Sequence, residues 1–343
     1  MRVLVTGGAG YIGSHACVAL MEAGYEPVVV DSLVNGSREA LRRVEQIAGR
    51  SLIFHAADIR DRARLDAILR ETPVEAALHF AALKAVGESV ADPLRYVDNN
   101  VGGTVTLCQA LTAAGVDTVV FSSSATVYGM AERMPVDEDA PLSVVNPYGR
   151  TKLMSEQVLT DLQVARPRLR VALLRYFNPG GAHPSGRIGE SPKNEPDNLL
   201  PYIARVAVGE LPRLRVFGAD YPTPDGTGVR DYIHILDLVR GHVVALDALL
   251  DPGGAYAEGG VLTVNLGTGR GYSVLEMLHA FERAAGRDLP YEIVDRRPGD
   301  VAECYADASR AQRLLGWQAD LGIDRICEDA WRWQRANPHG FEV

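Results

Sequence analysis

Short apolar stretches alternate with longer segments of mixed polarity along the first half of the chain. Continuous apolar runs of this length are typical of strands that a parallel sheet buries on both faces. The predicted strands are residues 2–5, 28–30, 52–55, 76–80, 118–122 and 170–176. The predicted helices between them include residues 11–23, 62–70, 93–114 and 148–165. This alternation predicts an α/β fold with a Rossmann-type doubly wound parallel sheet.

The second half of the chain has a different pattern. Residues 178–198 are rich in Pro, Gly and Asn, which indicates a long functional loop. The elements expected beyond it are helices over residues 198–208, 236–250, 274–285, 309–315 and 323–335, and strands over 214–217, 262–266 and 291–294. Because 343 residues leave room for about two domains, we predict a first domain over residues 1–178, rejoined by a segment of about residues 229–268, and a smaller α/β substrate-binding domain over residues 179–343.

A glycine-rich run from Thr6 to Gly13 directly follows the first predicted strand. Glycines at positions 7, 10 and 13 allow a tight turn, close approach of backbone N–H groups to a pyrophosphate, and close packing of the following helix on the strand. The positive N-terminus of that helix favours the same phosphates. The second strand ends in Asp31, where a carboxylate reaches the adenosine ribose hydroxyls and repels the extra phosphate of NADP. These features predict an NAD site in the first domain.

Tyr148 and Lys152 are four residues apart on a predicted helix, so the phenol and the ammonium lie on one face. A free tyrosine has a pKa of about 10, and a nearby ammonium favours its phenolate, as does the positive charge of an oxidised nicotinamide. Tyr148 is therefore the predicted acid/base catalyst. Ser124, after the preceding strand, is expected to hydrogen-bond the same reacting hydroxyl.

Other polar residues also follow the carboxyl ends of predicted strands, namely Asp58, Lys84, Ser122 to Ser124 and Asn178. Ligands of open parallel sheets bind at those ends. We therefore expect these residues to meet in one crevice.

The formal net charge of -9 argues against a nucleic acid or an anionic membrane as a partner, since both require a basic surface. The sequence shows neither a signal-peptide pattern nor a stretch apolar and long enough to span a bilayer, so we expect a cytoplasmic location. Cys17, Cys108, Cys304 and Cys327 are scattered and form no CxxC spacing. They predict neither a metal site nor a disulfide framework.

On these motifs the chain resembles the UDP-galactose 4-epimerase family of the extended short-chain dehydrogenase/reductase superfamily, over essentially its whole length. The resemblance lies in residues 6–13, 84–89, 122–129, 148 with 152, 174–179 and 225–234. The first and fourth of these motifs are shared widely in the superfamily, and the others are much narrower.

The resemblance implies an NAD-dependent isomerase that interconverts UDP-galactose and UDP-glucose without net redox change. Tyr148 would take the proton of the sugar 4-hydroxyl while a hydride leaves C4 for NAD, and the 4-keto sugar would turn and regain the hydride on its opposite face. The implied NAD contacts are Gly7, Gly10, Tyr11, Ile12, Gly13, Asp31, Ser32, Asn35, Gly36, Asp58, Ile59, Phe80, Ala81, Ala82, Lys84, Asn99, Ser124, Tyr148, Lys152 and Phe177.

The resemblance also assigns the UDP-sugar mainly to the second half. Arg230 and Arg297 would clamp the diphosphate, a role that suits a forked guanidinium. Phe217 would lie against the uracil, and Asp300 would bind the uridine ribose. The implied substrate contacts are Lys84, Ser124, Tyr148, Asn178, Asn198, Leu199, Arg215, Val216, Phe217, Arg230, Tyr232, Arg297, Asp300 and Cys304.

Cys304 stands where some family members carry a bulky tyrosine that looks like a wall near the hexose 2-position. The smaller cysteine favours acceptance of UDP-N-acetylglucosamine and UDP-N-acetylgalactosamine as well. The other interpretation is that Cys304 is a small buried hydrophobic residue and that its neighbours fill the gap. Both interpretations stay open at the level of the sequence.

Other functions are compatible with the same fold. Sugar nucleotide dehydratases of this superfamily carry an acidic pair where this chain has Ala125 and Thr126, whereas pentose or uronate 4-epimerases remain alternatives. A protein that senses NAD without turnover has no need of Ser124, Tyr148 and Lys152 together. By resemblance, the segment 93–114 and the helix carrying Lys152 would pair with their copies in a homodimer.

Overall fold

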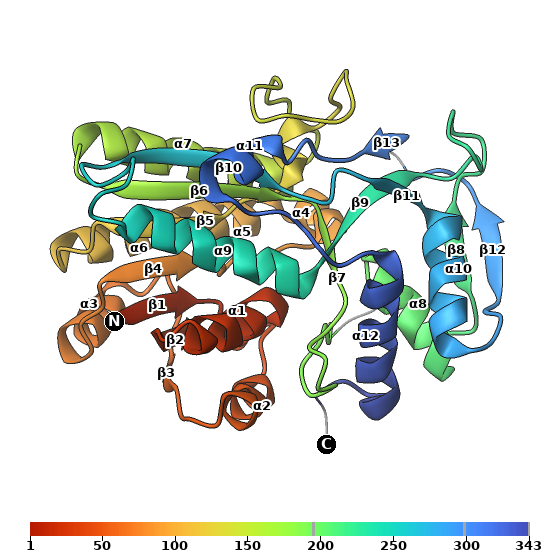
Figure 1. Ribbon diagram of the computed structural model, residues 1–343, viewed down its shortest axis with the longest axis horizontal. Coiled ribbons are helices and arrows are strands. Elements are labelled where there is room, and N and C mark those ends of the chain that lie inside the picture. Colours follow the sequence, from red (N-terminus) through yellow and green to blue (C-terminus); the bar gives the residue numbers. More distant parts are fainter. Residues whose placement is uncertain (194–195, 298–299, 342–343) are drawn as a thin grey trace. The chain divides into compact units, whose positions relative to one another are not determined.

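The computed structural model describes residues 1–193, 196–297 and 300–341 (Figure 1). The chain divides into two compact units, each built from three separate segments. The first unit comprises Met1–Gly129, Pro141–Tyr176 and Val239–Val264. The second unit comprises Met130–Ala140, Phe177–Leu238 and Asn265–Val343.

A seven-stranded sheet in the order β10-β6-β5-β4-β1-β2-β3 organises the first unit. The pairs between β3 and β6 are all parallel. The order reverses at β1, which lies between β2 and β4, and such a reversal is where open parallel sheets bind ligands. The α/β fold predicted from the alternation is confirmed. The strands are β1 (Arg2–Thr6), β2 (Glu26–Asp31), β3 (Ile53–Ala56), β4 (Ala76–His79), β5 (Thr118–Ser122), β6 (Arg170–Tyr176) and β10 (Gly260–Leu266).

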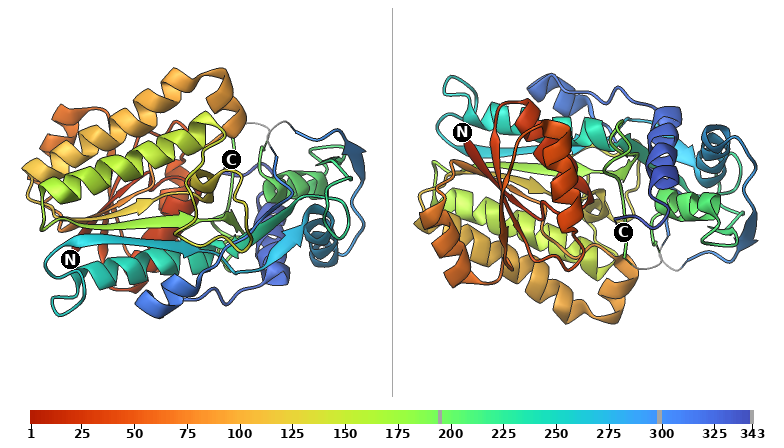
Figure 2. Two further views of the ribbon diagram at one scale, coloured as in Figure 1. Left: turned by 90° about the horizontal axis from the view of Figure 1, so that it is seen from above. Right: turned by 90° about the horizontal axis from the view of Figure 1, so that it is seen from below.

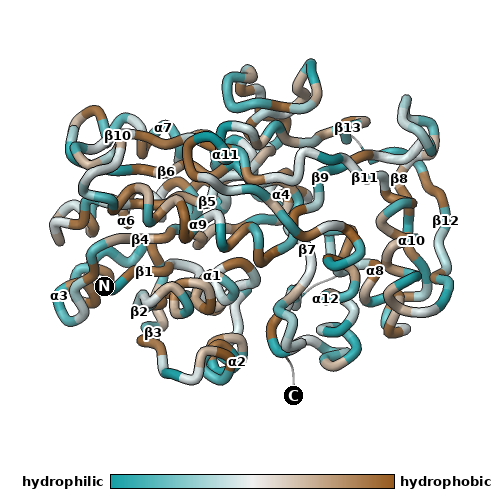
Figure 3. The backbone as a smooth tube through the Cα atoms, viewed as in Figure 1, coloured by the Kyte–Doolittle hydropathy of each residue, from teal (hydrophilic) through white to brown (hydrophobic). Residues whose placement is uncertain are grey.

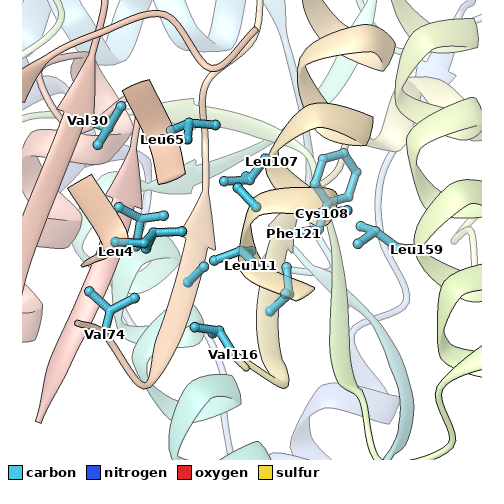
Figure 4. Packing of buried hydrophobic residues seen from close by; sticks show 14 of the residues in the cluster. Leu4, Val30, Leu65, Val74, Leu107, Cys108, Leu111, Val116, Phe121 and Leu159 are labelled. Atoms are coloured by element: carbon cyan, nitrogen blue, oxygen red, sulfur yellow. The ribbon is translucent and has the colours of Figure 1, made fainter. Parts of the chain in front are cut away.

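Helices cover both faces of this sheet, with α3, α6 and α7 on one face and α1 and α9 on the other (Figure 2). On the first face, Leu4 and Val30 of the sheet pack against Leu65 of α3, Leu107 of α6 and Leu159 of α7 (Figure 4). This apolar layer fixes the helices against the sheet. The helices are α1 (Tyr11–Glu22), α2 (Arg38–Ala48), α3 (Arg62–Glu71), α4 (Val86–Ala91), α5 (Pro93–Tyr96), α6 (Gly103–Ala113), α7 (Pro147–Ala165) and α9 (Ile235–Leu250).

The segment predicted as one helix over residues 93–114 is interrupted. It forms α5, the π-helical η1 (Val97–Gly102) and α6. Asn100 of η1 binds the chain after β4, because its Oδ1 accepts the Leu83 N–H at 2.8 Å and its Nδ2 donates to the Leu83 carbonyl at 3.0 Å. The prediction of a continuous α-helix was wrong in its middle, since apolar periodicity does not distinguish a π turn from an α turn.

The second unit is built around β9, which pairs with β7, β11 and β13. A separate parallel pair joins β8 and β12. Its apolar core lies between α8, α10 and α12, and hydrophobic and hydrophilic residues alternate along α10 and α12 as expected for amphipathic helices (Figure 3). The elements are β7 (Asn178–Gly180), α8 (Leu199–Val208), β8 (Leu214–Phe217), β9 (Val229–His234), β11 (Gly271–Ser273), α10 (Val274–Ala285), β12 (Tyr291–Val294), β13 (Glu303–Cys304), α11 (Ser309–Leu315) and α12 (Ile323–Ala336).

The two units differ in their bounds from the two predicted domains, which were expected to divide at residue 178, with a segment of about residues 229–268 rejoining the first. The segment that rejoins the first unit is 239–264, because β9 pairs only with strands of the second unit. Residues 130–140 belong to the second unit, where the Val136 N–H donates to the Tyr305 carbonyl at 2.9 Å. Among the described residues, no helix has the length and apolar character needed to cross a membrane.

Candidate functional site

The glycine turn after β1 has the geometry of a phosphate-binding loop. Gly7 has a φ of +74°, and its N–H donates to the Val30 carbonyl at 2.9 Å. A Cβ at Gly13 would lie 2.2 Å from the Gly7 carbonyl oxygen, so only glycine lets α1 pack this closely on the turn. The helix begins after Gly10 with no capping side chain, and a helix N-terminus of this kind favours an anion.

Asp31 at the end of β2 ties its own loop to the glycine turn. Its buried carboxylate accepts the Ala9 N–H at 3.0 Å and the Leu33 N–H at 2.7 Å. A Cβ at Gly36 would lie 2.8 Å from the Ala9 side chain. The segment from Asp31 to Gly36, which includes Ser32 and Asn35, therefore folds against the glycine turn.

Ser124, Tyr148 and Lys152 lie at the end of β5 and the start of α7, and all three are buried. The Lys152 Nζ donates to the Ser122 carbonyl at 2.7 Å and lies 5.0 Å from the centre of the Phe121 ring. The Tyr148 side chain packs in a buried apolar cluster with Leu83 and Tyr96. The helix thus presents the phenol and the ammonium from the same face, as their spacing predicts.

Burial controls the protonation of this pair. Removal from water raises the pKa of Tyr148 above its ordinary value, the neighbouring Tyr176 raises it further, and a hydrogen bond with Ser124 lowers it. Burial lowers the pKa of Lys152 to about 8, against the attraction of Glu156. In the protein alone the pKa of Tyr148 is therefore raised, because desolvation outweighs the hydrogen bond with Ser124.

A buried ion pair joins Glu156 of α7, one turn beyond Lys152, to Arg175 of β6. The Arg175 guanidinium donates to both oxygens of Glu156, with Nη2 at 2.7 Å from Oε2 and Nε at 3.0 Å from Oε1. The Ser123 hydroxyl donates to the same carboxylate at 2.5 Å. The Glu156 carboxylate thus pairs with the Arg175 guanidinium and also attracts the buried Lys152 ammonium. Sequence reasoning gave Glu156 no role, although its spacing of four from Lys152 was a usable signal.

His79 at the end of β4 links three elements of the first unit. Its Nδ1 lies 2.7 Å from the Thr6 hydroxyl and its Nε2 lies 3.0 Å from the Thr104 hydroxyl. Because Thr104 donates its single proton to the Asn100 carbonyl at 2.6 Å, His79 Nε2 is the donor and Nδ1 the acceptor. Burial lowers the pKa of His79 to about 3, so the imidazole is neutral. Sequence reasoning assigned no role to His79, despite its position inside an apolar strand.

Most of the remaining predicted NAD contacts of the first unit also follow strands of its sheet, whereas Asn99 lies in η1. Arg60 binds the Asp58 carboxylate and lowers its pKa, and Ile59 packs beside Gly103. The Phe80 ring lies 4.9 Å from that of His242. Asn99 donates to Asn100 at 2.9 Å. Lys84 is exposed, and Ala81 and Ala82 precede it on the same segment. Tyr11 stacks edge-on against His15.

In the second unit, Phe217 at the end of β8 lies among guanidinium groups. The Arg297 guanidinium is 3.9 Å from the Phe217 ring centre, and that of Arg215 is 5.9 Å from it. Asp300 donates its N–H to the Arg297 carbonyl at 3.3 Å. Phe217 and Arg297, predicted for the uracil and the diphosphate, are therefore brought together here, whereas Arg230 lies on β9.

Arg230 and Cys304 are paired across the strands β9 and β13. The Arg230 Nη1 donates to the Val229 carbonyl at 2.8 Å, and Cys304 is half-buried. Tyr232, two residues along β9, is paired with Asn178 of β7. Arg230 and Cys304 are thus neighbours on adjacent strands of this sheet.

Other predicted substrate contacts of the second unit are more dispersed. Asn198, at the start of α8 with Leu199 next to it, donates to Glu190 at 3.2 Å. Val216 and Tyr232 are buried in the core of the unit. Phe177, a predicted NAD contact, is also buried and begins the unit's second segment. The roles assigned to these residues stay predictions.

The first unit's residues fit a dinucleotide. The glycine turn excludes side chains at Gly7 and Gly13, since a Cβ at Gly7 would lie 2.7 Å from the Ala81 nitrogen. The helix N-terminus favours phosphates, and Asp31 places a carboxylate next to the turn. The site can therefore hold a nucleotide cofactor and combine it with the tyrosine, lysine and serine described above.

The chain matches known proteins along most of its length. The model of the NAD dependent epimerase/dehydratase family matches residues 3–257. A relative from Bacillus subtilis named UDP-glucose 4-epimerase is 58% identical over 342 residues, which cover 100% of this chain and 99% of the relative. The human protein of the same name is 52% identical over 347 residues, which cover 99% of this chain and 98% of the relative.

Solved structures of similar proteins also match this chain over almost its whole length. The crystal structure of UDP-glucose 4-epimerase from Bifidobacterium longum, in complex with NAD+ and UDP, has a TM-score of 0.95 and 50% sequence identity to this chain. The match covers 99% of this chain and 100% of that protein.

Proposed function

This chain belongs to the NAD dependent epimerase/dehydratase family, and on that premise we propose that it interconverts UDP-galactose and UDP-glucose by inverting C4 of the hexose. The observation that carries the proposal is full-length identity of 58% and 52% to relatives named UDP-glucose 4-epimerase. The chain is thus an isomerase that uses NAD, with Ser124, Tyr148 and Lys152 as its catalytic residues.

NAD+ held by the glycine turn and Asp31 would supply a reversible hydride acceptor for sugar C4 and a positive charge that favours the Tyr148 phenolate. Tyr148 removes the proton of the 4-hydroxyl and afterwards gives it back. Ser124 hydrogen-bonds the Tyr148 phenol, and the Lys152 ammonium, held on the Ser122 carbonyl, contributes a fixed positive charge. The 4-keto sugar turns about its diphosphate linkage between the two half-reactions, and the product is the C4 epimer.

We assign NAD to the first unit and the nucleotide of the substrate to the second. The glycine turn and Asp31 support the first assignment. The grouping of Phe217 and Arg297 supports the second, since an aromatic ring and a guanidinium suit a base and a diphosphate, and Asp300 follows three residues after Arg297.

We also propose that the enzyme accepts the N-acetylated sugars, UDP-N-acetylglucosamine and UDP-N-acetylgalactosamine. The support is the small side chain of Cys304 beside Arg230. Replacement of Cys304 by Tyr is expected to abolish turnover of the N-acetylated sugars and to retain that of UDP-galactose. If both activities survive the replacement equally, Cys304 does not set the size of the pocket.

The proposed function is tested with the purified protein. Denaturation should release NAD, detected by chromatography, and the native protein should convert UDP-galactose to UDP-glucose. Tyr148→Phe should retain NAD and lose most turnover, because the ring stays in its apolar cluster while the hydroxyl is gone. A protein that releases no dinucleotide, or a Tyr148→Phe variant with full turnover, would refute the mechanism.

A homodimer is proposed as the functional assembly, in the cytoplasm. Val90 of α4 and Leu94 of α5 are 63% and 79% exposed, and two large apolar side chains this exposed on adjacent helices support a contact with a second copy. The four cysteines are free, as expected in a reducing compartment. Sedimentation of Leu94→Glu should show a smaller species than the unaltered protein, and cell fractionation tests the compartment.

A further inference from the structure

Thr126 occupies both hydrogen-bond acceptor sites of the Ser124 hydroxyl. Its Oγ accepts the Thr126 N–H at 3.2 Å and the Thr126 hydroxyl at 2.9 Å. A serine hydroxyl has two lone pairs and one proton. With both lone pairs engaged by Thr126, only the proton remains for a further partner, and that partner must be an acceptor.

The acceptor available to this proton is the phenol oxygen of Tyr148, which is hydrogen-bonded to the Ser124 side chain. We propose that Thr126 is a positioning residue that fixes the Ser124 hydroxyl as a donor to Tyr148. Donation from Ser124 stabilises a phenolate and is lost if the hydroxyl rotates to become an acceptor. The inference rests on the proposed function for its catalytic consequence, and its geometry stands independently.

Gly149 keeps Thr126 in this place. The residue directly follows Tyr148 in α7, and its N–H donates to the Asn146 side chain at 2.8 Å. A Cβ at Gly149 would lie 2.9 Å from the Thr126 carbonyl oxygen and 3.3 Å from its hydroxyl oxygen. The missing side chain therefore lets the turn η2 (Ala125–Tyr128) pack directly against the start of α7. The donor and the phenol are thereby held on two segments in van der Waals contact.

The chemistry of the side chain at position 126 decides the direction of the hydrogen bond. Threonine can donate to Ser124, whereas an ionised carboxylate can only accept. An acidic residue would compete with Tyr148 for the Ser124 proton. Thr126 thus suits a site that passes a proton between a phenol and a sugar hydroxyl.

The test is a double-mutant cycle in the NAD-loaded enzyme. Thr126→Val removes the donor at nearly constant shape, Thr126→Ser retains it, and Ser124→Ala removes the group it orients. Thr126→Val is expected to lower kcat for UDP-galactose about three- to tenfold, the usual size of one hydrogen bond, with little change in KM. In the Ser124→Ala background the same change should have no further effect, and Thr126→Ser should restore most of kcat.

A second measurement is independent of turnover. In protein carrying ¹³Cζ-labelled tyrosine, the Tyr148 resonance, assigned with Tyr148→Phe, should shift alike in Thr126→Val and Ser124→Ala and return in Thr126→Ser. Equal losses of kcat from Thr126→Val with and without Ser124, or an unmoved Tyr148 resonance, would overturn the proposal. An unaltered protein that fails to convert UDP-galactose refutes the proposed function instead, and the resonance still decides the role of Thr126.

Discussion

Replacement of Glu156 by Gln should strongly destabilise the first unit. The side chains of Arg175 and Glu156 are 7% and 4% exposed, and the buried Lys152 ammonium depends on the same carboxylate. Loss of one partner of a buried ion pair costs about 3–5 kcal/mol, because the remaining charge is neither hydrated nor paired. Gln keeps the shape and can still accept one hydrogen bond, so we expect about 3 kcal/mol, measured by urea unfolding at a fixed excess of NAD.

An exposed ion pair of the same unit provides the matched control. The side chains of Arg2 and Glu26 are 41% and 48% exposed, and their atoms Nε and Oε2 are 3.0 Å apart. Glu26→Gln should cost about 0–1 kcal/mol, since water hydrates both groups. Replacement of both buried partners by apolar residues, Glu156→Leu with Arg175→Met, should cost less than Glu156→Gln alone. If Glu156→Gln costs no more than Glu26→Gln, the buried carboxylate does not stabilise its two cations.

Three further outcomes follow from the site. Gly13→Ala should lose most bound NAD, because its Cβ would lie 2.2 Å from the Gly7 carbonyl oxygen. The bound NAD is measured by chromatography after denaturation. The control Gly87→Ala should keep its NAD, since a Cβ there meets nothing within 4 Å. Burial lowers the pKa of His79 to about 3, whereas that of an unfolded histidine is about 6.5. Between these two pH values the unfolded chain binds more protons than the folded one. The free energy of unfolding should therefore fall by roughly 4–5 kcal/mol as the pH is lowered from about 6.5 to 3. His79→Gln should flatten this acid loss in denaturation curves, and an unchanged slope would exclude His79 as its source. Because the pKa of Lys152 is lowered to about 8, the unfolded chain also binds more protons between about pH 8 and 10.5, so Lys152 should make stability rise over that range. Lys152→Met should remove that rise, and a variant that keeps it would contradict the assignment.

The inner strands of the first unit's sheet could be predicted because they are buried on both faces and therefore almost continuously apolar, whereas the edge strand β3 is only partly buried. The helix α2 escaped prediction since its sequence is strongly polar, although Ser37 caps it by accepting the Glu39 N–H and Gly49 ends it in the left-handed conformation. The strands β7, β11 and β13 have only two or three residues, too few to show a period. They exist because β9 supplies backbone partners.

The position of Tyr148 and Lys152 on one helix face could be predicted from their spacing, but the pKa shifts of the two groups could not. The separation of Tyr148 and Lys152 along a helix places both groups on one face, whatever surrounds them. The protonation of Tyr148 depends on burial by Leu83 and Tyr96, which only the tertiary structure supplies. Glu156 and His79 escaped notice because a polar residue in an apolar segment gains meaning only when its hydrogen-bond partners are known.

The discontinuous path of the chain also bears on biosynthesis. The edge strand β10 pairs beside β6, yet 83 residues separate the end of β6 at Tyr176 from the start of β10 at Gly260. A nascent chain that has emerged only as far as Tyr176 carries six of the seven strands and leaves the backbone groups of β6 without a neighbour on one side. The ribosome must therefore complete two of the three segments of the second unit, Met130–Ala140 and Phe177–Leu238, before the first unit can close, and a gene cut at any single point cannot encode either unit alone.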